Sequence, residues 1–155
     1  MKIAIGADHN AFKMKEALKE YIKELGHEVI DYGCHSEEEV DYPGIAFDLA
    51  TGVAEGKADR GILVCGTGIG MAIAANKVPG IRAAQCHDTY SAERAQLSNN
   101  AQIITLGAKV IGLETAKKVV ETYLSVTFQG GNSARKIEQI MTKEKEFHEA
   151  SLTTN

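Results

Sequence analysis

Short apolar runs alternate with segments of helical periodicity along the whole chain. The runs are nearly continuous in apolar residues, which is typical of parallel strands that are buried on both faces of a sheet. The segments between them repeat apolar residues at three- and four-residue spacing, as one face of an amphipathic helix does. The pattern predicts five strands, at residues 2–6, 28–32, 61–65, 82–86 and 102–106.

Two of the helical segments have a well-defined apolar face. One face lies between Met14 and Leu25 and ends before Gly26, a residue type that commonly terminates helices. The other lies between Leu113 and Leu124. Strands that alternate with helices in this way form a doubly wound parallel sheet with right-handed crossovers, so the sequence predicts the α/β class.

A further amphipathic segment, residues 133–149, follows a break at residues 129–132 ("QGGN"). The sheet does not require this segment, so we expect it to pack on a neighbouring subunit. Residues 153–155 ("TTN") are expected to fray. The apolar positions of the segment are Ile137, Ile140, Met141 and Phe147.

Length and composition are ordinary for a soluble globular protein. The 155 residues fit a single domain that spans 1–155, with 44% hydrophobic and 25% charged residues. A net charge of −4 argues against broad binding to nucleic acid or to an anionic membrane. No apolar run reaches transmembrane length, and the chain begins directly with a strand-like run, so we expect a cytoplasmic protein.

The cysteines predict free thiols. Cys34, Cys65 and Cys86 are an odd number with no metal-binding spacing such as C-x-x-C, which makes a disulfide framework unexpected. Two of them have a histidine as the next residue, a spacing that cannot chelate a metal without distant ligands. We therefore predict no metal site.

The residues that follow the predicted strands are polar or glycine. Ligands of open α/β sheets bind beyond the carboxyl ends of the strands, so these loops are expected to meet at one binding edge. The residues concerned are Asp8 and His9, then Cys65 with the glycines after it, then His87 and Asp88, and finally residues 107–109.

The glycine-rich loop at residues 66–70 does not match the common nucleotide-binding motifs. Met71 stands where a dinucleotide fingerprint needs its third glycine, and the G-K-[ST] of a P-loop is absent. One interpretation is a turn whose backbone N–H groups bind an anion near a helix N-terminus. The alternative is a close helix–strand contact that leaves no room for side chains.

Cys65 also has two interpretations. A lone cysteine is usually a small core hydrophobe, and we assign that role to Cys34 and Cys86. Cys65 differs because it ends a strand, faces a helix N-terminus and has the Thr67 hydroxyl nearby. Such surroundings stabilise a thiolate, which can act as a base or a nucleophile.

Four stretches resemble the type B ribose-5-phosphate isomerases, a family that includes galactose-6-phosphate isomerase. They are "GADH" (6–9), "VDYP" (40–43), "DRGILVCGTGIGMAIAANKVPGIRA" (59–83) and "GAKVIG" (107–112). The resemblance covers residues 2 to about 141. It implies a flavodoxin-like (Rossmann-type) three-layer sandwich with a five-stranded parallel sheet and neither metal nor organic cofactor. It also implies a homodimer or dimer of dimers, with active sites between subunits and a C-terminal helix (133–150) docked on the partner.

The resemblance assigns roles to particular positions. Cys65 falls on the catalytic base, with Thr67 and Asp8 beside it, and Ser98 falls on the ring-opening position. The implied reaction is aldose–ketose isomerisation of a small phosphorylated sugar through a cis-enediolate, with ribose 5-phosphate and ribulose 5-phosphate as the leading pair. Substrate contacts are implied for Asp8, His9, Gly66, Thr67, Gly68, Ile69, Gly70, Asn99, Lys109, Asn132, Arg135 and Lys136.

The sequence departs from the family pattern where the substrate would be recognised. Ser98 replaces a histidine that many members carry, and Asn132 and Lys136 stand where arginines are usual. The stretch 87–104 is similar to a branch linked to tetrose phosphates. The same reaction on erythrulose 4-phosphate, or on a hexose 6-phosphate such as galactose or allose 6-phosphate, is therefore an alternative. A non-catalytic sugar-phosphate-binding module is another, although such a binder has no need of a base at Cys65.

Overall fold

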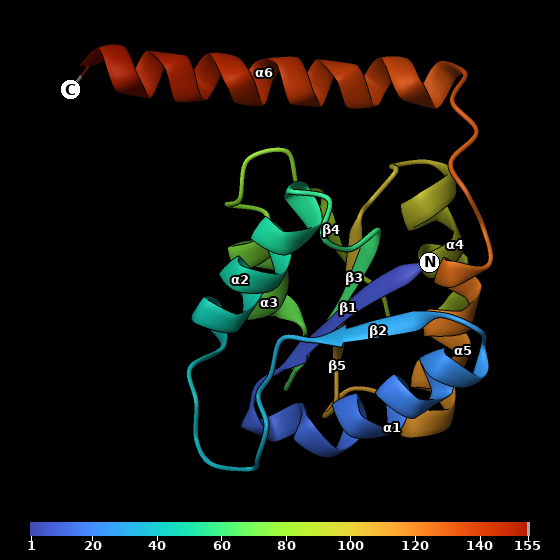
Figure 1. Cartoon of the computed structure of the whole chain (residues 1–155). Helices are drawn as coiled ribbons and strands as arrows, with labels where there is room; N and C mark the ends of the chain where they lie inside the picture. Colours follow the sequence, from blue (N-terminus) through green and yellow to red (C-terminus); the bar gives the residue numbers. More distant parts are fainter. Residues whose placement is uncertain (155) are drawn as a thin grey trace.

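A five-stranded parallel sheet forms the centre of the computed structural model, which describes residues 1–154 (Figure 1). All five predicted strands are present, and their ends differ from the prediction by no more than one residue. The strands are β1 (Lys2–Ala7), β2 (Glu28–Asp31), β3 (Arg60–Cys65), β4 (Ala83–Gln85) and β5 (Ile103–Gly107).

The strand order is β2-β1-β3-β5-β4, with all neighbours parallel. The flavodoxin order is 2-1-3-4-5, so this sheet keeps the flavodoxin-like arrangement but inserts β5 between β3 and β4. As a result β1, β3 and β5 are adjacent central strands. Ala7 pairs with Val64 and Cys65 with Gly107, so the ends of these three strands lie side by side.

Helices cover both faces of the sheet (Figure 1). The helices α1, α4 and α5 pack on one face, and α2 and α3 pack on the other. Along β3 the side chains alternate, so that Val64 faces the first layer and Cys65 the second. The helical elements are η1 (His9–Ala11), α1 (Phe12–Glu24), α2 (Tyr42–Ala54), α3 (Ile69–Ala75), α4 (Thr89–Leu97), α5 (Leu113–Leu124) and α6 (Asn132–Thr154).

The C-terminal helix α6 is longer than predicted and packs partly on its own chain. It continues through Thr154, so the expected fraying is wrong for residues 153 and 154, while Asn155 lies outside the described residues. Ile137 is buried, Glu144 accepts a hydrogen bond from the Gly80 N–H (3.0 Å), and Met141 Sδ accepts one from Arg82 (2.9 Å). The helix thus lies over the loop before β4, and its far end projects beyond the body of the protein (Figure 1).

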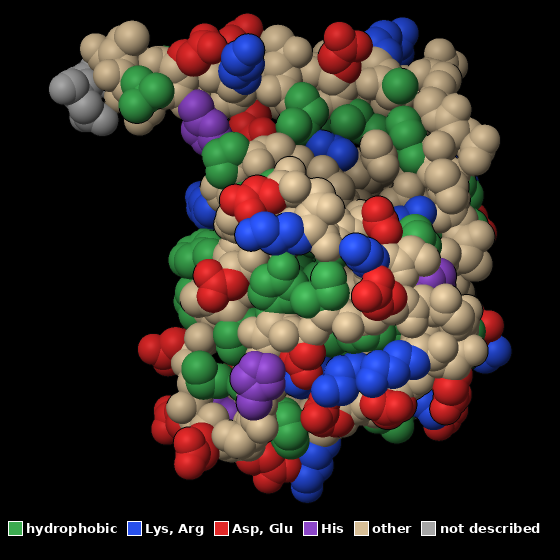
Figure 2. All heavy atoms as spheres, viewed as in Figure 1, with side chains coloured by type: hydrophobic (Ala, Val, Ile, Leu, Met, Phe, Trp, Pro, Cys, Tyr) green, Lys and Arg blue, Asp and Glu red, His purple; other side chains and the backbone are tan. Residues whose placement is uncertain are grey.

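The surface carries acidic and basic side chains interspersed over the face shown in Figure 2. Ile140 and Phe147, two of the four apolar positions expected to bind a partner, are more than half exposed on α6. Within the described part of the chain, no helix is both long and apolar enough to cross a membrane.

Candidate active site

The predicted site residues form two groups at opposite edges of the sheet. The carboxyl-edge group follows β1, β3 and β5, and the amino-edge group lies at the end of α4 and the start of α6. The carboxyl-edge group contains Asp8, His9, Cys65, residues 66–70 and Lys109. The amino-edge group contains Ser98, Asn99, Asn132, Arg135 and Lys136.

Cys65 ends β3 with its side chain 4% exposed. Its Sγ accepts a hydrogen bond from the Gly68 N–H (3.1 Å), at the start of α3. The Thr67 hydroxyl oxygen accepts a hydrogen bond from the Ile69 N–H (3.2 Å), which leaves its O–H free to donate. The Gly68 amide is a second donor at the sulfur, besides the Thr67 hydroxyl that the resemblance implies.

The other two cysteines, Cys34 and Cys86, are buried thiols. Burial raises the pKa of the Cys86 thiol to about 12, and it also raises the pKa of the Cys34 thiol. Both thiols are therefore neutral near pH 7 and behave as small core groups, as the sequence predicted.

The glycine loop lies in contact with the end of β5. A Cβ on Gly107 would lie 2.6 Å from the Thr67 Cα, and a Cβ on Gly68 would lie 2.9 Å from the Leu106 carbonyl carbon. These neighbours are backbone atoms, which cannot rotate away. Gly68 also has a φ of 80°, which side chains disfavour. The close-contact interpretation is therefore confirmed for Gly68, whose N–H donates to the Cys65 sulfur.

Three hydrogen bonds from β5 and the residues after it fix this contact. The Ala108 N–H donates to the Cys65 carbonyl (2.9 Å) and the Lys109 N–H to the Gly66 carbonyl (3.0 Å). The Thr105 hydroxyl donates to the Gly68 carbonyl (2.8 Å). The loop is thus held along most of its length before any substrate binds, which is the preorganisation that charge stabilisation in catalysis requires.

Asp8 and His9 are held beside Cys65 by backbone groups. Asp8 is 5% exposed. Its carboxylate accepts a hydrogen bond from the Asn10 N–H (3.1 Å), and its backbone N–H donates to the Val64 carbonyl (3.2 Å). Nδ1 of His9 lies 3.1 Å from the Val40 nitrogen and 3.2 Å from the Val40 carbonyl oxygen, and these contacts fix the orientation of the ring.

Two neighbours of the loop had no assigned role. The Tyr42 ring lies on Gly70, where a Cβ would be 2.3 Å from the ring, and Gln85 Nε2 donates to the Thr67 carbonyl (2.8 Å). Tyr42 belongs to the "VDYP" stretch, so the resemblance could have indicated it as a site residue. No sequence pattern indicates Gln85, because its contact with Thr67 depends on the position of β4.

The amino-edge group surrounds the end of α4. Arg94 Nε donates to the Ser98 hydroxyl (2.8 Å). The Arg82 guanidinium donates to the carbonyls of Asn99 and Asn100 and also contacts Met141 of α6, so the two helices lie on the same side of the protein. The side chains of α6 in this group, Asn132, Arg135 and Lys136, are all exposed.

The two groups do not meet within one chain. Gly61 of β3 bonds to the Gln102 carbonyl at the amino edge, whereas Cys65 pairs with Gly107 at the carboxyl edge. Four residues of strand separate these points by roughly 13 Å. A small sugar phosphate that contacts Cys65 therefore cannot also contact Ser98 of the same chain.

In residues 1–154, no group of three or more His, Cys, Asp or Glu side chains is arranged to hold a metal ion. The functional groups gathered at the carboxyl edge are the Cys65 thiol, the Asp8 carboxylate, the His9 imidazole and the backbone amides of the glycine loop.

Comparison with known proteins identifies the family. A model described as Ribose/Galactose Isomerase matches residues 3–140. The chain belongs to the ribose/galactose isomerase family. The resemblance seen in the sequence is thereby confirmed.

Several relatives within the ribose/galactose isomerase family are similar over nearly the whole chain. D-erythrulose-4-phosphate isomerase of Pectobacterium atrosepticum is 54% identical over 141 residues, covering 90% of this chain and 93% of that protein. Ribose-5-P isomerase B of Listeria innocua is 51% identical over 138 residues, covering 89% and 93%. The structure of Clostridium thermocellum ribose-5-phosphate isomerase B superposes with a TM-score of 0.93 at 46% identity, covering 95% and 99%.

The contact between the loop and β5 predicts different effects for two glycine substitutions. Gly107→Ala inserts a methyl group between backbones and should lower the free energy of unfolding by about 1–3 kcal/mol. Gly44→Ala, in α2 with no atom within 4 Å of the added carbon, should leave stability unchanged or raise it by up to about 1 kcal/mol. Urea unfolding of both variants is the measurement. Equal stabilities would show that the loop does not lie this close to β5.

Proposed function

We propose that this protein is an aldose–ketose sugar-phosphate isomerase that interconverts ribose 5-phosphate and ribulose 5-phosphate, with Cys65 as the base. The observation that carries the proposal is the Cys65 sulfur at the carboxyl edge, bonded by the Gly68 N–H and flanked by Asp8. The relatives named above are sugar-phosphate isomerases, which supports the reaction class. The free state of all three cysteines supports a cytoplasmic location.

The reaction follows from these groups. The Cys65 thiolate removes the proton from C2 of the aldose, and the bonding electrons form a cis-enediolate. A proton moves from O2 to O1 of this intermediate, and the thiol returns its proton to C1, so that C2 becomes the carbonyl carbon of the ketose. N–H groups of the loop at residues 66–70 stabilise the oxygen charge that develops, an effect that is usually the largest in such sites. Asp8 and His9 hold the sugar hydroxyls, and Lys109, whose side chain lies over Gly66, attracts the anionic substrate.

The separation of the two groups supports an active site shared between subunits of a homodimer or a dimer of dimers. In this arrangement the carboxyl-edge group of one subunit meets the amino-edge group of its partner, so Asn132, Arg135 and Lys136 on α6 bind the phosphate across the interface. An exposed apolar surface beside Cys65 is available for the partner to cover. It consists of Tyr42, Phe47, Ile69 and Ile73 on α2 and α3, which are 37–59% exposed.

A tetrose 4-phosphate is a second candidate substrate, favoured by the state of Ser98. Its hydroxyl oxygen accepts the hydrogen bond from Arg94, so the side chain is a positioned O–H donor and a poor proton shuttle compared with imidazole. Ribose 5-phosphate is mostly a closed furanose and must be opened, whereas in erythrulose 4-phosphate the oxygen that would close the ring carries the phosphate. The 54% identical relative is named for this tetrose.

The base is tested by substitution. Cys65→Ala should lower kcat by roughly 10²–10⁴-fold, the contribution of general-base catalysis, while stability falls by only about 1 kcal/mol. Cys86→Ala, which removes a core thiol, should retain activity. Isomerisation of ribose 5-phosphate without added metal and urea unfolding are the measurements. More than about a tenth of wild-type turnover in Cys65→Ala would mean that another residue is the base.

The shared site is tested by mixing two inactive chains. Cys65→Ala and Lys136→Met each damage a different half of the site. Subunit exchange should restore about a quarter of wild-type activity, because half of the dimers are mixed and each has one intact site. If each chain carried its own complete site, the mixture would stay inactive.

The substrate is tested at Ser98. If the tetrose is the substrate, wild type should accept erythrulose 4-phosphate with kcat/KM equal to or above that for ribose 5-phosphate. Ser98→His should shift the ratio toward the pentose, because imidazole can transfer the protons that open the ring. A wild-type enzyme that strongly prefers ribose 5-phosphate would leave the pentose as the substrate and remove this role from position 98.

A further inference from the structure

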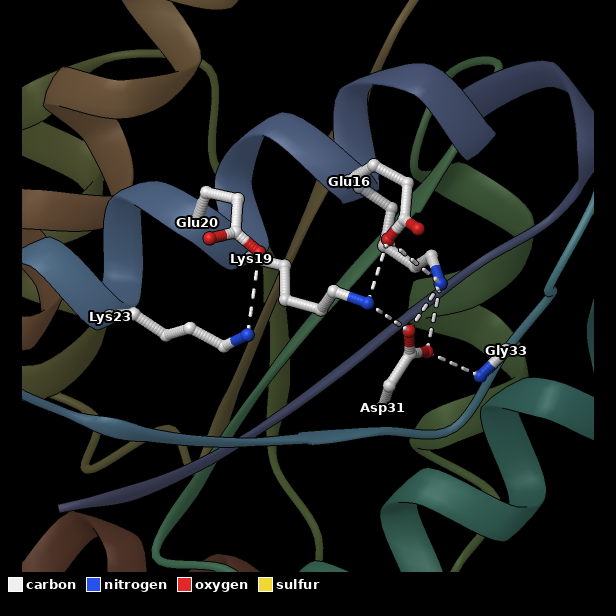
Figure 3. A network of polar contacts seen from close by, with 7 residues as sticks. Glu16, Lys19, Glu20, Lys23, Asp31 and Gly33 are labelled. Carbon is white, nitrogen blue, oxygen red and sulfur yellow. Dashed lines mark hydrogen bonds and ion pairs between the residues drawn. The ribbon is translucent and has the colours of Figure 1, made fainter.

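A buried lysine and a half-buried aspartate form an ion pair between α1 and β2. Lys15 of α1 is fully buried, and its Nζ lies 2.8 and 2.7 Å from the two carboxylate oxygens of Asp31, the last residue of β2. Lys19 adds a third contact at 3.0 Å (Figure 3). Removing an ammonium group from water is costly unless it is paired, so this arrangement holds α1 and β2 together in one geometry.

The carboxylate also fixes the turn that follows β2. Asp31 Oδ1 accepts a hydrogen bond from the Gly33 N–H (2.8 Å), as Figure 3 shows. The Gly33 carbonyl in turn accepts from the Ala7 N–H (2.7 Å), and the Cys34 N–H donates to the Ala7 carbonyl (2.7 Å). Asp31 is thus two hydrogen bonds away from the last residue of β1.

Ala7 is followed directly by Asp8. The Asp8 N–H bonds to Val64 on the opposite side, so this segment is fixed between β3 and the turn at residues 33–34. Of these two contacts, the one with the turn is linked to the ion pair of Lys15 and Asp31, through Gly33. The helix that carries Lys15 begins directly after η1, which contains His9. The ion pair therefore also limits the position of His9.

We propose that Lys15 and Asp31 are positioning residues for the isomerase site: through Gly33 and Ala7, their ion pair holds Asp8 and His9 against the end of β3, next to Cys65. The inference rests on the proposed function. It assigns no substrate contact to either residue. The position of Asp8 depends on the hydrogen bond that the Asp31 carboxylate accepts from the Gly33 N–H.

The charge state of Asp31 agrees with this role. Burial raises the pKa of the carboxyl, but the hydrogen bonds from Lys15, Gly33 and Lys19 outweigh burial and leave the pKa below its ordinary value. The stabilisation is therefore present above the pKa of the unfolded chain and is lost only as the pH falls through the lower folded value. The carboxylate is an acceptor throughout the neutral range.

Two double variants separate positioning from general stability. Lys15→Met/Asp31→Asn removes both charges but keeps an amide oxygen that can accept from Gly33. Lys15→Met/Asp31→Leu removes the acceptor as well. Both avoid the unpaired buried charge that a single substitution would leave. The matched control is Lys23→Met/Glu20→Gln, which removes an exposed pair on the same helix (3.3 Å) that has no link to the turn.

The asparagine variant should keep kcat for sugar-phosphate isomerisation within about threefold of wild type. The leucine variant should lose roughly 10- to 100-fold in kcat, with a smaller change in KM, because misplacement of about 1 Å acts mainly on the transition state. Amide hydrogen exchange at Gly33 and Ala7 should accelerate in the leucine variant alone. The control should match wild type in every measurement.

Equal kcat in the two double variants, or a loss in both that follows their unfolding free energies, would overturn the proposal. If the leucine variant does not fold, Lys15→Met/Asp31→Ala replaces it, and a loss of more than about tenfold in the folded asparagine variant still overturns the proposal. A wild-type protein inactive on every phosphorylated sugar would refute the proposed function instead. Amide exchange at Gly33 and Ala7 would then still decide whether the pair anchors this segment.

Discussion

The contact between the loop at residues 66–70 and the end of β5 is the constraint on which the candidate site depends. Two backbones approach within the space that a single Cβ would occupy, and this is possible only because Gly68 and Gly107 lack one. The contact directs the Gly68 N–H at the Cys65 sulfur. It also requires β5 to lie next to β3, so the strand order and the chemistry of the thiol depend on each other.

The central strands could be predicted to within one residue because burial on both faces leaves an uninterrupted apolar run. Their order was not predicted, although β4 contains Gln85 and is only partly buried, whereas β5 is buried throughout. The place of β5 beside β3 depends on the contact made by Gly107. The same limit applies to the Gly68 amide. Its hydrogen bond to the Cys65 sulfur depends on the geometry of the loop, which the residues alone do not give.

The C-terminal helix shows a different limit of sequence analysis. Its apolar positions correctly predicted an amphipathic helix, but periodicity does not say which surface the helix covers. Met141 contacts Gly80 and Arg82 of the chain's own loop and Ile137 is buried, whereas Ile140 and Phe147 stay exposed. Some apolar side chains of α6 are therefore covered within the chain, and others remain exposed and available to a partner.

A shared site would change the physics of the carboxyl edge as well as its residue content. Cys65 and Asp8 are already 4% and 5% exposed, so their hydrogen bonds act in a medium poorer in water than bulk solvent. A partner that covers Ile69 and Ile73 would exclude water from the mouth of the loop too. Electrostatic interactions strengthen as the local dielectric falls, so the same N–H groups would stabilise an enediolate more strongly. Association would then contribute to catalysis twice, by bringing the phosphate-binding cations and by drying the site in which charge develops.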